Sequence, residues 1–500
     1  MSDSNSYMGM FQIGGLASGI DTKSIVEKLM EIETQPLKKV QTNFDELKYK
    51  QKSWTEINDK LQGFWDYMTT FSFQKNLIPK KAESADTDKV EATALSTSSN
   101  IDFYVKTTQL ASSSYIKGTA DSAITTASTL SDLSALDGDT LTFTVDGNAV
   151  TLNIKDDGTG DLKTTDTIQT LTDVINSKTD SNMIFEDGQV FVLNKNTGDK
   201  SLQIDSSNAN ILDKLFSTGT ATTLTDVANG VTGSNANVEI SFDGSTTHMT
   251  LTESSNNFNF NNVTLNIKSV DTSFTKISVS QDIDKSVEKI KEFVDKYNDV
   301  MNFLYDKLNE NKVTDKAESD MTDEDKMKGL LKGDSNLENL FYKIKNIGYS
   351  QLNLVNNTND YTSLYSIGVS SGDLEGNYSN TEKGLLSVDE EKLKEALNNN
   401  AHDVWNLFAL NDLNNEEYGI GTQLKNYLWD TTKFGGYIDQ ISGTTGTIGV
   451  QMRSLAKEMV TMLDNVHKKE AYYNMKFSAM EQAINNMNSQ GSYISQAFSK

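Results

Sequence analysis

Apolar residues recur at alternating steps of three and four near both ends of this chain, and this pattern restricts the fold more than any other feature. Between residues 37 and 71 the repeat continues for about four to five heptads. A heptad repeat predicts a helix with one narrow apolar stripe, which is stable only when a partner covers that stripe. The sequence therefore predicts long terminal helices that pack against each other or against further copies of the chain.

The N-terminal repeat is preceded by a shorter amphipathic helix. Asp21 or Thr22 is expected to cap this helix, because a short side-chain oxygen satisfies free N–H groups at a helix start. Pro36 is expected to interrupt it or to begin the next helix. The residues expected to make assembly contacts here are Leu16, Ile20, Ile25, Leu29, Ile32, Leu37, Val40, Phe44, Leu47, Trp54, Leu61 and Trp65.

The C-terminal repeat begins near residue 448 and shifts by one step of four across Glu470. Such a stutter locally unwinds a coiled coil. A helix of about 50 residues is about 75 Å long. Its expected assembly contacts are Met452, Leu455, Met459, Val466, Tyr473, Phe477, Met480, Ile484, Met487, Ile494 and Phe498.

The middle of the chain, residues 81–280, is rich in Thr, Ser, Asn, Asp and Gly. Alternating apolar and polar residues around Asp-Gly pairs predict β-hairpins at 139–158 and 237–253. A short helix is expected at 166–178, followed by a strand pair at 183–195. These patterns predict two β-rich domains.

The pattern along the whole chain predicts an α+β multidomain protein. Long terminal coiled-coil helices pair as a stalk, and β-rich domains are inserted in the middle of the chain. The polar residues 309–328 are expected to form a loop, and the glycine-rich residues 435–446 a break. The predicted domains are a terminal helical leg (1–42 with 447–500), a helical stalk (43–80 with 281–446), a β-rich head (81–130 with 231–280) and a second β-rich head (131–230).

Charge is distributed unevenly along the chain, whose net charge is −25. Residues 1–80 hold ten acidic and ten basic side chains, whereas residues 446–500 hold four and six. The acidic excess therefore lies in the middle. Arg453 is the single arginine, so nucleic acid and anionic membranes are not expected as partners.

Neither composition nor motifs indicate an enzyme or a cofactor. The chain has no cysteine, and no GxGxxG, P-loop, GxSxG or HExxH motif is present. His248, His402 and His467 are isolated from other metal-ligating types. "DDGTGD" (156–161) is expected to be a hairpin turn, with a cation site as the alternative. No apolar run predicts a membrane helix, and the start lacks the pattern of a cleaved secretion signal.

Five blocks of sequence resemble the bacterial flagellar filament cap family, FliD, in the order found in that family. The first is "GLASGIDTKSIVEKLMEIETQPL" (15–37), and the second is "DTIQTLTDVINSK" (166–178), which is similar to the flagellin hook IN motif. The others lie at 253–304, 383–408 and 469–498. Together they span nearly the whole chain.

The resemblance implies a non-enzymatic cap that assembles as a ring of about five subunits. Family members hold exported flagellin beneath the ring and promote its folding and insertion at the filament tip. They meet hook-filament junction proteins, leave the cell through the flagellar type III system without a cleaved signal, and bind an export chaperone. Here that chaperone is expected on residues 470–498.

Two further hypotheses for the function are an adhesin and an enzyme. The β-rich residues 81–280 could serve as an adhesin for host glycans or mucin, since the family includes examples. A tip-mounted hydrolase or protease is the third reading, and no motif supports it.

Overall fold

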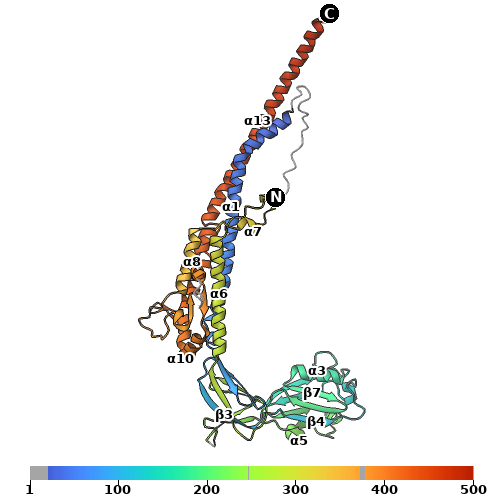
Figure 1. Cartoon of the computed structure of the whole chain (residues 1–500). Helices are drawn as coiled ribbons and strands as arrows, with labels where there is room; N and C mark the ends of the chain where they lie inside the picture. Colours follow the sequence, from blue (N-terminus) through green and yellow to red (C-terminus); the bar gives the residue numbers. More distant parts are fainter. Residues whose placement is uncertain (1–20, 246, 372–377, 499–500) are drawn as a thin grey trace. The chain divides into compact units, whose positions relative to one another are not determined.

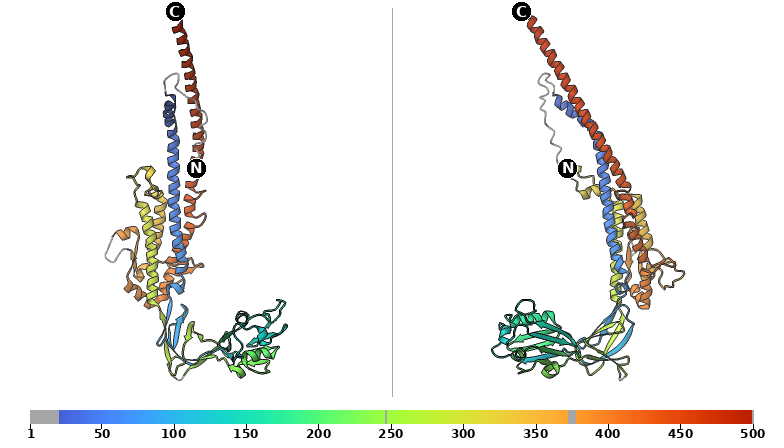
Figure 2. Two further views of the ribbon diagram at one scale, coloured as in Figure 1. Left: turned by 90° about the vertical axis from the view of Figure 1, so that its right-hand side faces the viewer. Right: turned by 180° about the vertical axis from the view of Figure 1, so that it is seen from behind.

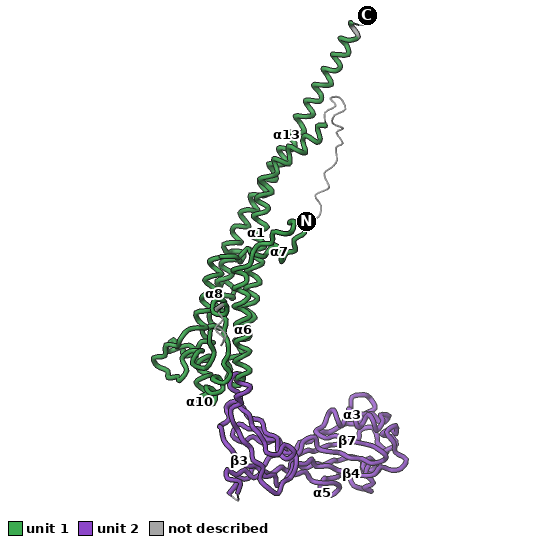
Figure 3. The backbone as a smooth tube through the Cα atoms, viewed as in Figure 1, with its two compact units in different colours: residues 1–76, 287–500 green, residues 77–286 purple. Residues whose placement is uncertain are grey.

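The computed structural model describes residues 21–245, 247–371 and 378–498 (Figure 1). The chain divides into two compact units (Figure 3). Unit 1 comprises residues 1–76 and 287–500, and unit 2 comprises residues 77–286. Long helices form most of unit 1, and antiparallel sheets form most of unit 2. The expected α+β fold, with helical ends and a β-rich middle, is confirmed; the four-domain division stays a prediction.

Unit 1 contains helices from both ends of the chain together with helices from residues 287–442; the first of these begins at Ile283, so its first four residues belong to unit 2. They are α1 (Thr22–Phe71), α6 (Ile283–Asn309), α7 (Asp323–Met327), α8 (Ser335–Gly348), α9 (Tyr378–Lys383), α10 (Glu390–Ala409), α11 (Ile420–Thr432), α12 (Tyr437–Ser442) and α13 (Thr447–Phe498). Two short strand pairs accompany them, β17 (Val369–Ser371) with β18 (Leu386–Val388) and β19 (Asn411–Asp412) with β20 (Glu417–Tyr418).

An aromatic cluster holds the helices of unit 1 together. Phe71 of α1 stacks on Phe293 of α6 with the ring centroids 5.0 Å apart, and Phe408 of α10 meets Phe293 edge-on at 5.3 Å. All three side chains are buried. Because α1, α6 and α10 come from distant parts of the sequence, this cluster closes the fold of unit 1.

The predicted interruption at Pro36 is wrong. Helix α1 is continuous from Thr22 to Phe71 and includes this proline. Proline removes one backbone hydrogen bond and crowds the preceding turn, which bends a long helix without ending it. Figure 1 shows such a bend in the N-terminal part of α1. The expected cap at Asp21 is confirmed, since its side chain accepts a hydrogen bond of 3.0 Å from the Ser24 amide.

Unit 2 consists of short strands with three short helices among them. They are β1 (Lys80–Ser84), β2 (Val90–Ala94), β3 (Ile101–Gln109), β4 (Tyr115–Thr119), β5 (Thr140–Val145), β6 (Asn148–Asn153), α3 (Ile168–Lys178), β7 (Ser181–Glu186), β8 (Gln189–Asn194), β9 (Leu202–Ser206), α4 (Ala209–Phe216), β10 (Thr223–Thr225), α5 (Asp226–Asn229), β11 (Gly230–Val231), β12 (Ala236–Ser241), β13 (Met249–Glu253), β14 (Asn257–Phe260), β15 (Val263–Ile267) and β16 (Thr275–Gln281).

Two hydrophobic cores organise these strands. The first lies between a sheet of order β1-β16-β3-β12-β13 and a sheet of order β14-β15-β2, and includes Phe103, Val238 and Phe258. The second involves the sheets β10-β9-β5-β6 and β11-β4-β8-β7 with helices α3 and α4, and includes Phe143 and Leu171.

The hairpins predicted at 139–158 and 237–253 are confirmed as the pairs β5–β6 and β12–β13, and the strand pair predicted at 183–195 is confirmed as β7–β8. Strands β5 and β6 are joined through Asp146 and Gly147, and strands β7 and β8 through Asp187 and Gly188. All four residues have positive φ. Two successive residues of positive φ give the turn whose twist matches a hairpin, and Asp-Gly adopts that conformation with little strain.

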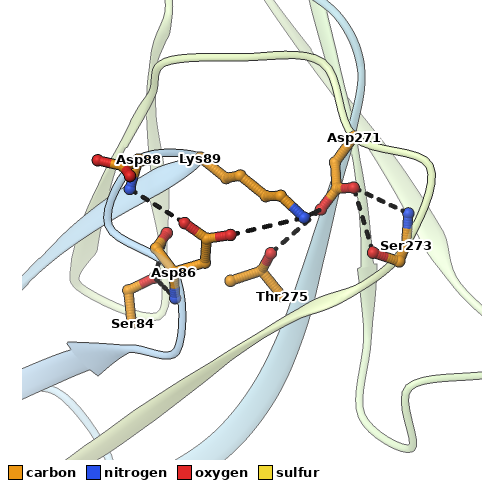
Figure 4. Close-up of polar contacts among 7 residues, drawn as sticks. All are labelled: Ser84, Asp86, Asp88, Lys89, Asp271, Ser273 and Thr275. Carbon is orange, nitrogen blue, oxygen red and sulfur yellow. Dashed lines mark hydrogen bonds and ion pairs between the residues drawn. The ribbon is translucent and has the colours of Figure 1, made fainter.

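A buried carboxylate ties the β1–β2 turn to the turn before β16 (Figure 4). Asp271 accepts hydrogen bonds from the Ser273 amide at 3.0 Å and from the Thr275 hydroxyl at 3.2 Å, and Lys89 lies 2.9 Å away. Burial by itself raises the pKa of Asp271, but Lys89 and Ser273 outweigh burial and lower this pKa to about 2. The network therefore favours the ionised carboxylate.

Acid is expected to weaken unit 2 through Asp271. The pKa of this carboxyl is lower in the folded chain than its unfolded value of about 3.9, so its contribution is present above that value and lost as pH falls toward about 2. Thermal unfolding of unit 2 at pH 6 and pH 3 measures the effect. The Asp271→Asn variant should lose less stability over this range than the parent; an equal loss would contradict the role of Asp271.

No helix in the described ranges combines the length and apolarity that crossing a bilayer requires.

Candidate assembly surface on the terminal helices

Helices α1 and α13 lie side by side and run in opposite directions (Figures 1 and 2). Near the start of α1, the Thr22 hydroxyl donates to Glu481 at 3.4 Å. Further along α1, the Gln51 side chain donates to the Ser442 carbonyl, just before α13, at 2.6 Å. The ends of the chain therefore pair within one subunit, which is one of the two arrangements that the heptad repeats predicted.

A polar cluster fixes the register of this pair. The carboxylate of Glu33 accepts hydrogen bonds from the Tyr473 hydroxyl at 2.9 Å and from Lys469 at 3.1 Å. These bonds, Tyr473 first, hold the pKa of Glu33 below its ordinary value. Charge-assisted hydrogen bonds depend on geometry, so they disfavour sliding of one helix along the other.

Most predicted contact residues of the pair are only partly buried. Val40 is buried, whereas Ile25 and Ile32 are exposed. Each helix buries only a stripe, because a two-helix layer has no third element to cover its sides. The predicted residues that remain half-buried are Leu29, Leu37, Phe44, Leu47, Met452, Leu455, Met459, Val466, Tyr473, Phe477, Met480 and Ile484.

Three predicted contact residues belong to the interior or the side of unit 1. Trp54 and Leu61 are fully buried. Trp65 is half-buried against Trp429 of α11, with ring centroids 5.0 Å apart. These side chains therefore stabilise unit 1 itself. Two further predicted residues, Leu16 and Ile20, lie outside the described residues.

The last turns of α13 carry exposed apolar side chains. Thr22, the first residue of α1, already lies opposite Glu481. Beyond that point Tyr493 is 78% exposed and Phe498 is 87% exposed, and Met487 and Ile494 are exposed as well. From residue 482 to 498 the sequence holds no charged side chain. We call Met487, Tyr493, Ile494 and Phe498 the terminal patch.

A feature that sequence reasoning missed is the route by which the chain enters α13. Helices α11, α12 and α13 follow one another along α1, separated by two turns with the same backbone hydrogen bonds. The amide of Gly436 bonds to the carbonyl of Lys433, and ten residues later the amide of Gly446 bonds to that of Gly443. In the sequence this repeat is visible as Gly436 and Gly446, which lie ten residues apart. The glycine-rich residues 435–446 were interpreted only as a break.

A second feature outside the predicted seam is an apolar stripe on the outer side of α13. Val450, Val460, Tyr472 and Met475 are all at least half exposed. Their spacing places them away from the heptad positions, so the heptad pattern does not include them. α13 therefore presents apolar side chains both toward and away from α1.

Family models match both parts of this architecture. A model described as the C-terminus of flagellar hook-associated protein 2 matches residues 233–489, and one described as its N-terminus matches residues 18–114. The two matches include all of α1 and most of α13.

Individual proteins are similar over almost the full chain. A flagellar hook-associated protein 2 of Thermotoga maritima is 29% identical, covering 98% of this chain and 96% of the relative. That of Halalkalibacterium halodurans is 26% identical, covering 97% and 99%. The crystal structure of the D1-D2-D3 domains of the flagellar cap protein FliD from Escherichia coli matches with a TM-score of 0.57 at 18% identity, covering 81% of this chain and 99% of that chain. This last likeness shows a shared fold.

Proposed function

The chain belongs to the flagellar hook-associated protein 2 family, and we propose that it caps the tip of a bacterial flagellar filament. In this proposal a closed ring of roughly five copies sits at the tip, outside the cell. Its role is structural: it retains newly exported flagellin and promotes its folding and insertion at the growing end.

The terminal patch carries this proposal. Tyr493 and Phe498 expose large aromatic side chains on a helix end without neighbouring charges. Large apolar side chains that gather exposed at one helix end typically mark a protein contact, and aromatic residues dominate the energy of such contacts. A helix partner suits this end, because the rest of α13 already pairs with a helix in the same way.

The half-buried seam suggests how a cap can stay attached while the filament grows. The α1–α13 contacts are narrow, so helices of similar pattern can replace one another without covalent chemistry. We propose flagellin and neighbouring copies as these helices, and hook-filament junction proteins before flagellin arrives.

Three further parts of the proposal rest on the family resemblance. The chain is exported through the flagellar type III system without a cleaved signal. An export chaperone covers residues 470–498 before assembly, which suits the exposed Tyr472 and Met475. Unit 2 is displayed outward, where an adhesin role toward glycans or mucin is the alternative function.

Light scattering on the full chain tests the proposal. The parent should form a ring of roughly five copies that dissociates on dilution. A Tyr493→Ser, Phe498→Ser double variant should assemble at least about tenfold more weakly, since each tenfold corresponds to 1.4 kcal/mol. The same double variant should fail to support filament growth in cells.

A matched control uses equally exposed aromatic residues elsewhere in unit 1. Tyr365 is 75% exposed and Phe434 is 99% exposed, and both lie away from the terminal patch. The Tyr365→Ser, Phe434→Ser variant should assemble like the parent. If both double variants assemble normally and support filament growth, the terminal patch has no part in assembly and the proposal fails.

A further inference from the structure

An irregular segment of unit 1 between α6 and α8 lies against α1 and has no role in the proposed cap. We call residues 313–328 the arm; it contains α7 (Figure 1). Within residues 313–326, all of which the structure describes, no apolar side chain is buried. Hydrophobic burial therefore does not hold this part of the arm in place.

The tip of the arm is stabilised by its own contacts. The Asp325 carboxylate accepts hydrogen bonds from the amide and the hydroxyl of Thr322 at 3.2 and 3.1 Å, and from Lys316 at 2.7 Å. The Thr322 hydroxyl in turn accepts from the Asp325 amide, which completes a capping box. The tip can therefore keep its fold when it leaves the surface beneath it.

The arm touches α1 through polar groups. Asp323 accepts a hydrogen bond from the Tyr49 hydroxyl at 3.1 Å and pairs with Lys52. The Lys326 ammonium lies 5.5 Å from the Tyr49 ring centroid, and Lys48 lies 6.0 Å from it. Lys52 and Asp323 are both about half exposed, and exposed ion pairs are worth at most about 1 kcal/mol each.

Charge explains why the arm lies on this part of α1. Residues 38–52 contain five lysines and two acidic residues, although the chain as a whole is strongly acidic. Residues 313–325 contain six acidic residues and one lysine. The two segments therefore attract each other, and this attraction does not depend on their belonging to the same copy.

The two residues that flank the arm, Lys312 and Gly329, lie against each other. Gly329 has φ +71°, and a Cβ there would lie 2.4 Å from the Lys312 backbone nitrogen. Met327, two residues before Gly329, is buried. With the tip folded between Lys316 and Asp325, three residues of the arm remain on each side, and three extended residues span about 10 Å. The tip can therefore exchange where α1 of a neighbouring copy lies within about one helix diameter, about 10 Å.

We propose that the arm exchanges between copies, so that Asp323 of one subunit binds Tyr49 and Lys52 of the next. The exchanged contacts are the same as those within one subunit, so the exchange needs no new complementary surface. It removes little apolar surface, because no apolar side chain of residues 313–326 is fully buried. The proposal rests on the self-assembly proposed above and adds a link between neighbours.

Because the chain has no cysteine, introduced thiols test the exchange directly. Lys48 and Lys326 approach the same ring, and neither makes an ion pair within the described ranges. A Lys48→Cys variant and a Lys326→Cys variant are refolded together, allowed to assemble, and treated with a short bifunctional thiol reagent. Exchange predicts a covalent dimer that contains one copy of each variant.

A matched control uses an ion pair in unit 1 that lies outside the arm. Lys291 and Glu390 lie 2.6 Å apart, and a mixture of Lys291→Cys and Glu390→Cys chains should give no covalent dimer. If the Lys48 and Lys326 variants assemble but give no covalent dimer, the exchange is overturned and the cap proposal stands. If the chain does not self-associate at any concentration, both proposals fail.

Charge reversal gives a second readout. Asp323→Lys should weaken assembly several-fold at low salt, and the loss should shrink as salt screens the repulsion. Asp320→Lys is the control, because Asp320 is exposed in the same arm and its side chain contacts only the neighbouring Ser319 hydroxyl within the described chain. Equal effects of the two reversals would show that net charge, not the Asp323 contact, controls assembly.

Discussion

Replacing Phe293 with alanine is expected to destabilise unit 1 by about 3–5 kcal/mol. The side chain is fully buried, and its ring lies within 6.3 Å of the rings of Phe64, Phe71, Tyr297 and Phe408. Alanine would leave a cavity among rigid aromatic rings from three helices, which cannot collapse easily to fill it. The loss is a large part of the roughly 5–15 kcal/mol that stabilises a typical folded protein.

Tryptophan fluorescence during denaturation by urea measures this loss in the full chain. The four tryptophans, Trp54, Trp65, Trp405 and Trp429, all belong to unit 1. Their signal therefore reports unit 1 while unit 2 stays silent. Phe434→Ala is the matched control, because Phe434 is almost fully exposed and its truncation should change the free energy of unfolding by less than about 0.5 kcal/mol. Similar midpoints for the two variants would contradict the central role of the Phe293 cluster.

The same cluster shows where sequence reasoning reaches its limit. The heptad spacing predicted that α1 is a helix and which of its faces is apolar. It did not predict that Phe71 meets Phe408, because spacing says nothing about partners more than 300 residues away. Local patterns fix the elements, whereas distant contacts fix how the elements pack.

Hairpins were predicted well for the same reason. Asp187 and Gly188 reverse the chain by their own backbone preferences, so the turn needs no distant partner. Pro36 was misjudged, because the helix continues when the contacts on both sides of the proline outweigh one lost hydrogen bond.

A buried carboxylate in unit 1 could not have been predicted. Glu417 accepts hydrogen bonds from three successive amides, those of Val355, Asn356 and Asn357, at 2.7, 2.8 and 3.0 Å. It holds a loop some sixty residues earlier in the chain, and these bonds lower its pKa to about 2. In the sequence Glu417 is one of many acidic residues, and only the fold distinguishes it.

The candidate assembly surface was predicted in its positions but not in its exposure. The heptad spacing placed Met487, Ile494 and Phe498 on one helix face, whereas Tyr493 was not among the predicted contact residues. That they remain exposed follows from the pairing of Thr22 with Glu481, which leaves the last turns of α13 beyond the start of α1. The register of two helices is a long-range property, so the sequence alone could not reveal which part of the seam is free.

Replacing Gly230 with alanine is expected to destabilise unit 2 by about 3 kcal/mol, the upper part of the range for overpacking. Gly230 pairs with Ile116 where β11 joins β4. A Cβ at this glycine would lie 1.8 Å from the carbonyl oxygen of Tyr115. A backbone atom cannot move aside as a flexible side chain does, so β11 and β4 must separate. Amide hydrogen exchange of peptides from β4 and β11 in the full chain should accelerate, while α1 is unaffected.

Gly63→Ala is the matched control, because it makes the same chemical change where there is room. Gly63 lies within α1, and no atom would come within 4 Å of an added Cβ. Alanine favours a helix interior over glycine by about 1 kcal/mol, so this variant should stabilise unit 1. Opposite signs for the two substitutions would attribute the loss at position 230 to the close approach of two strands. If Gly230→Ala left exchange in β4 and β11 unchanged, the strands would have to accommodate the methyl group, and that close approach would not be a requirement of the fold.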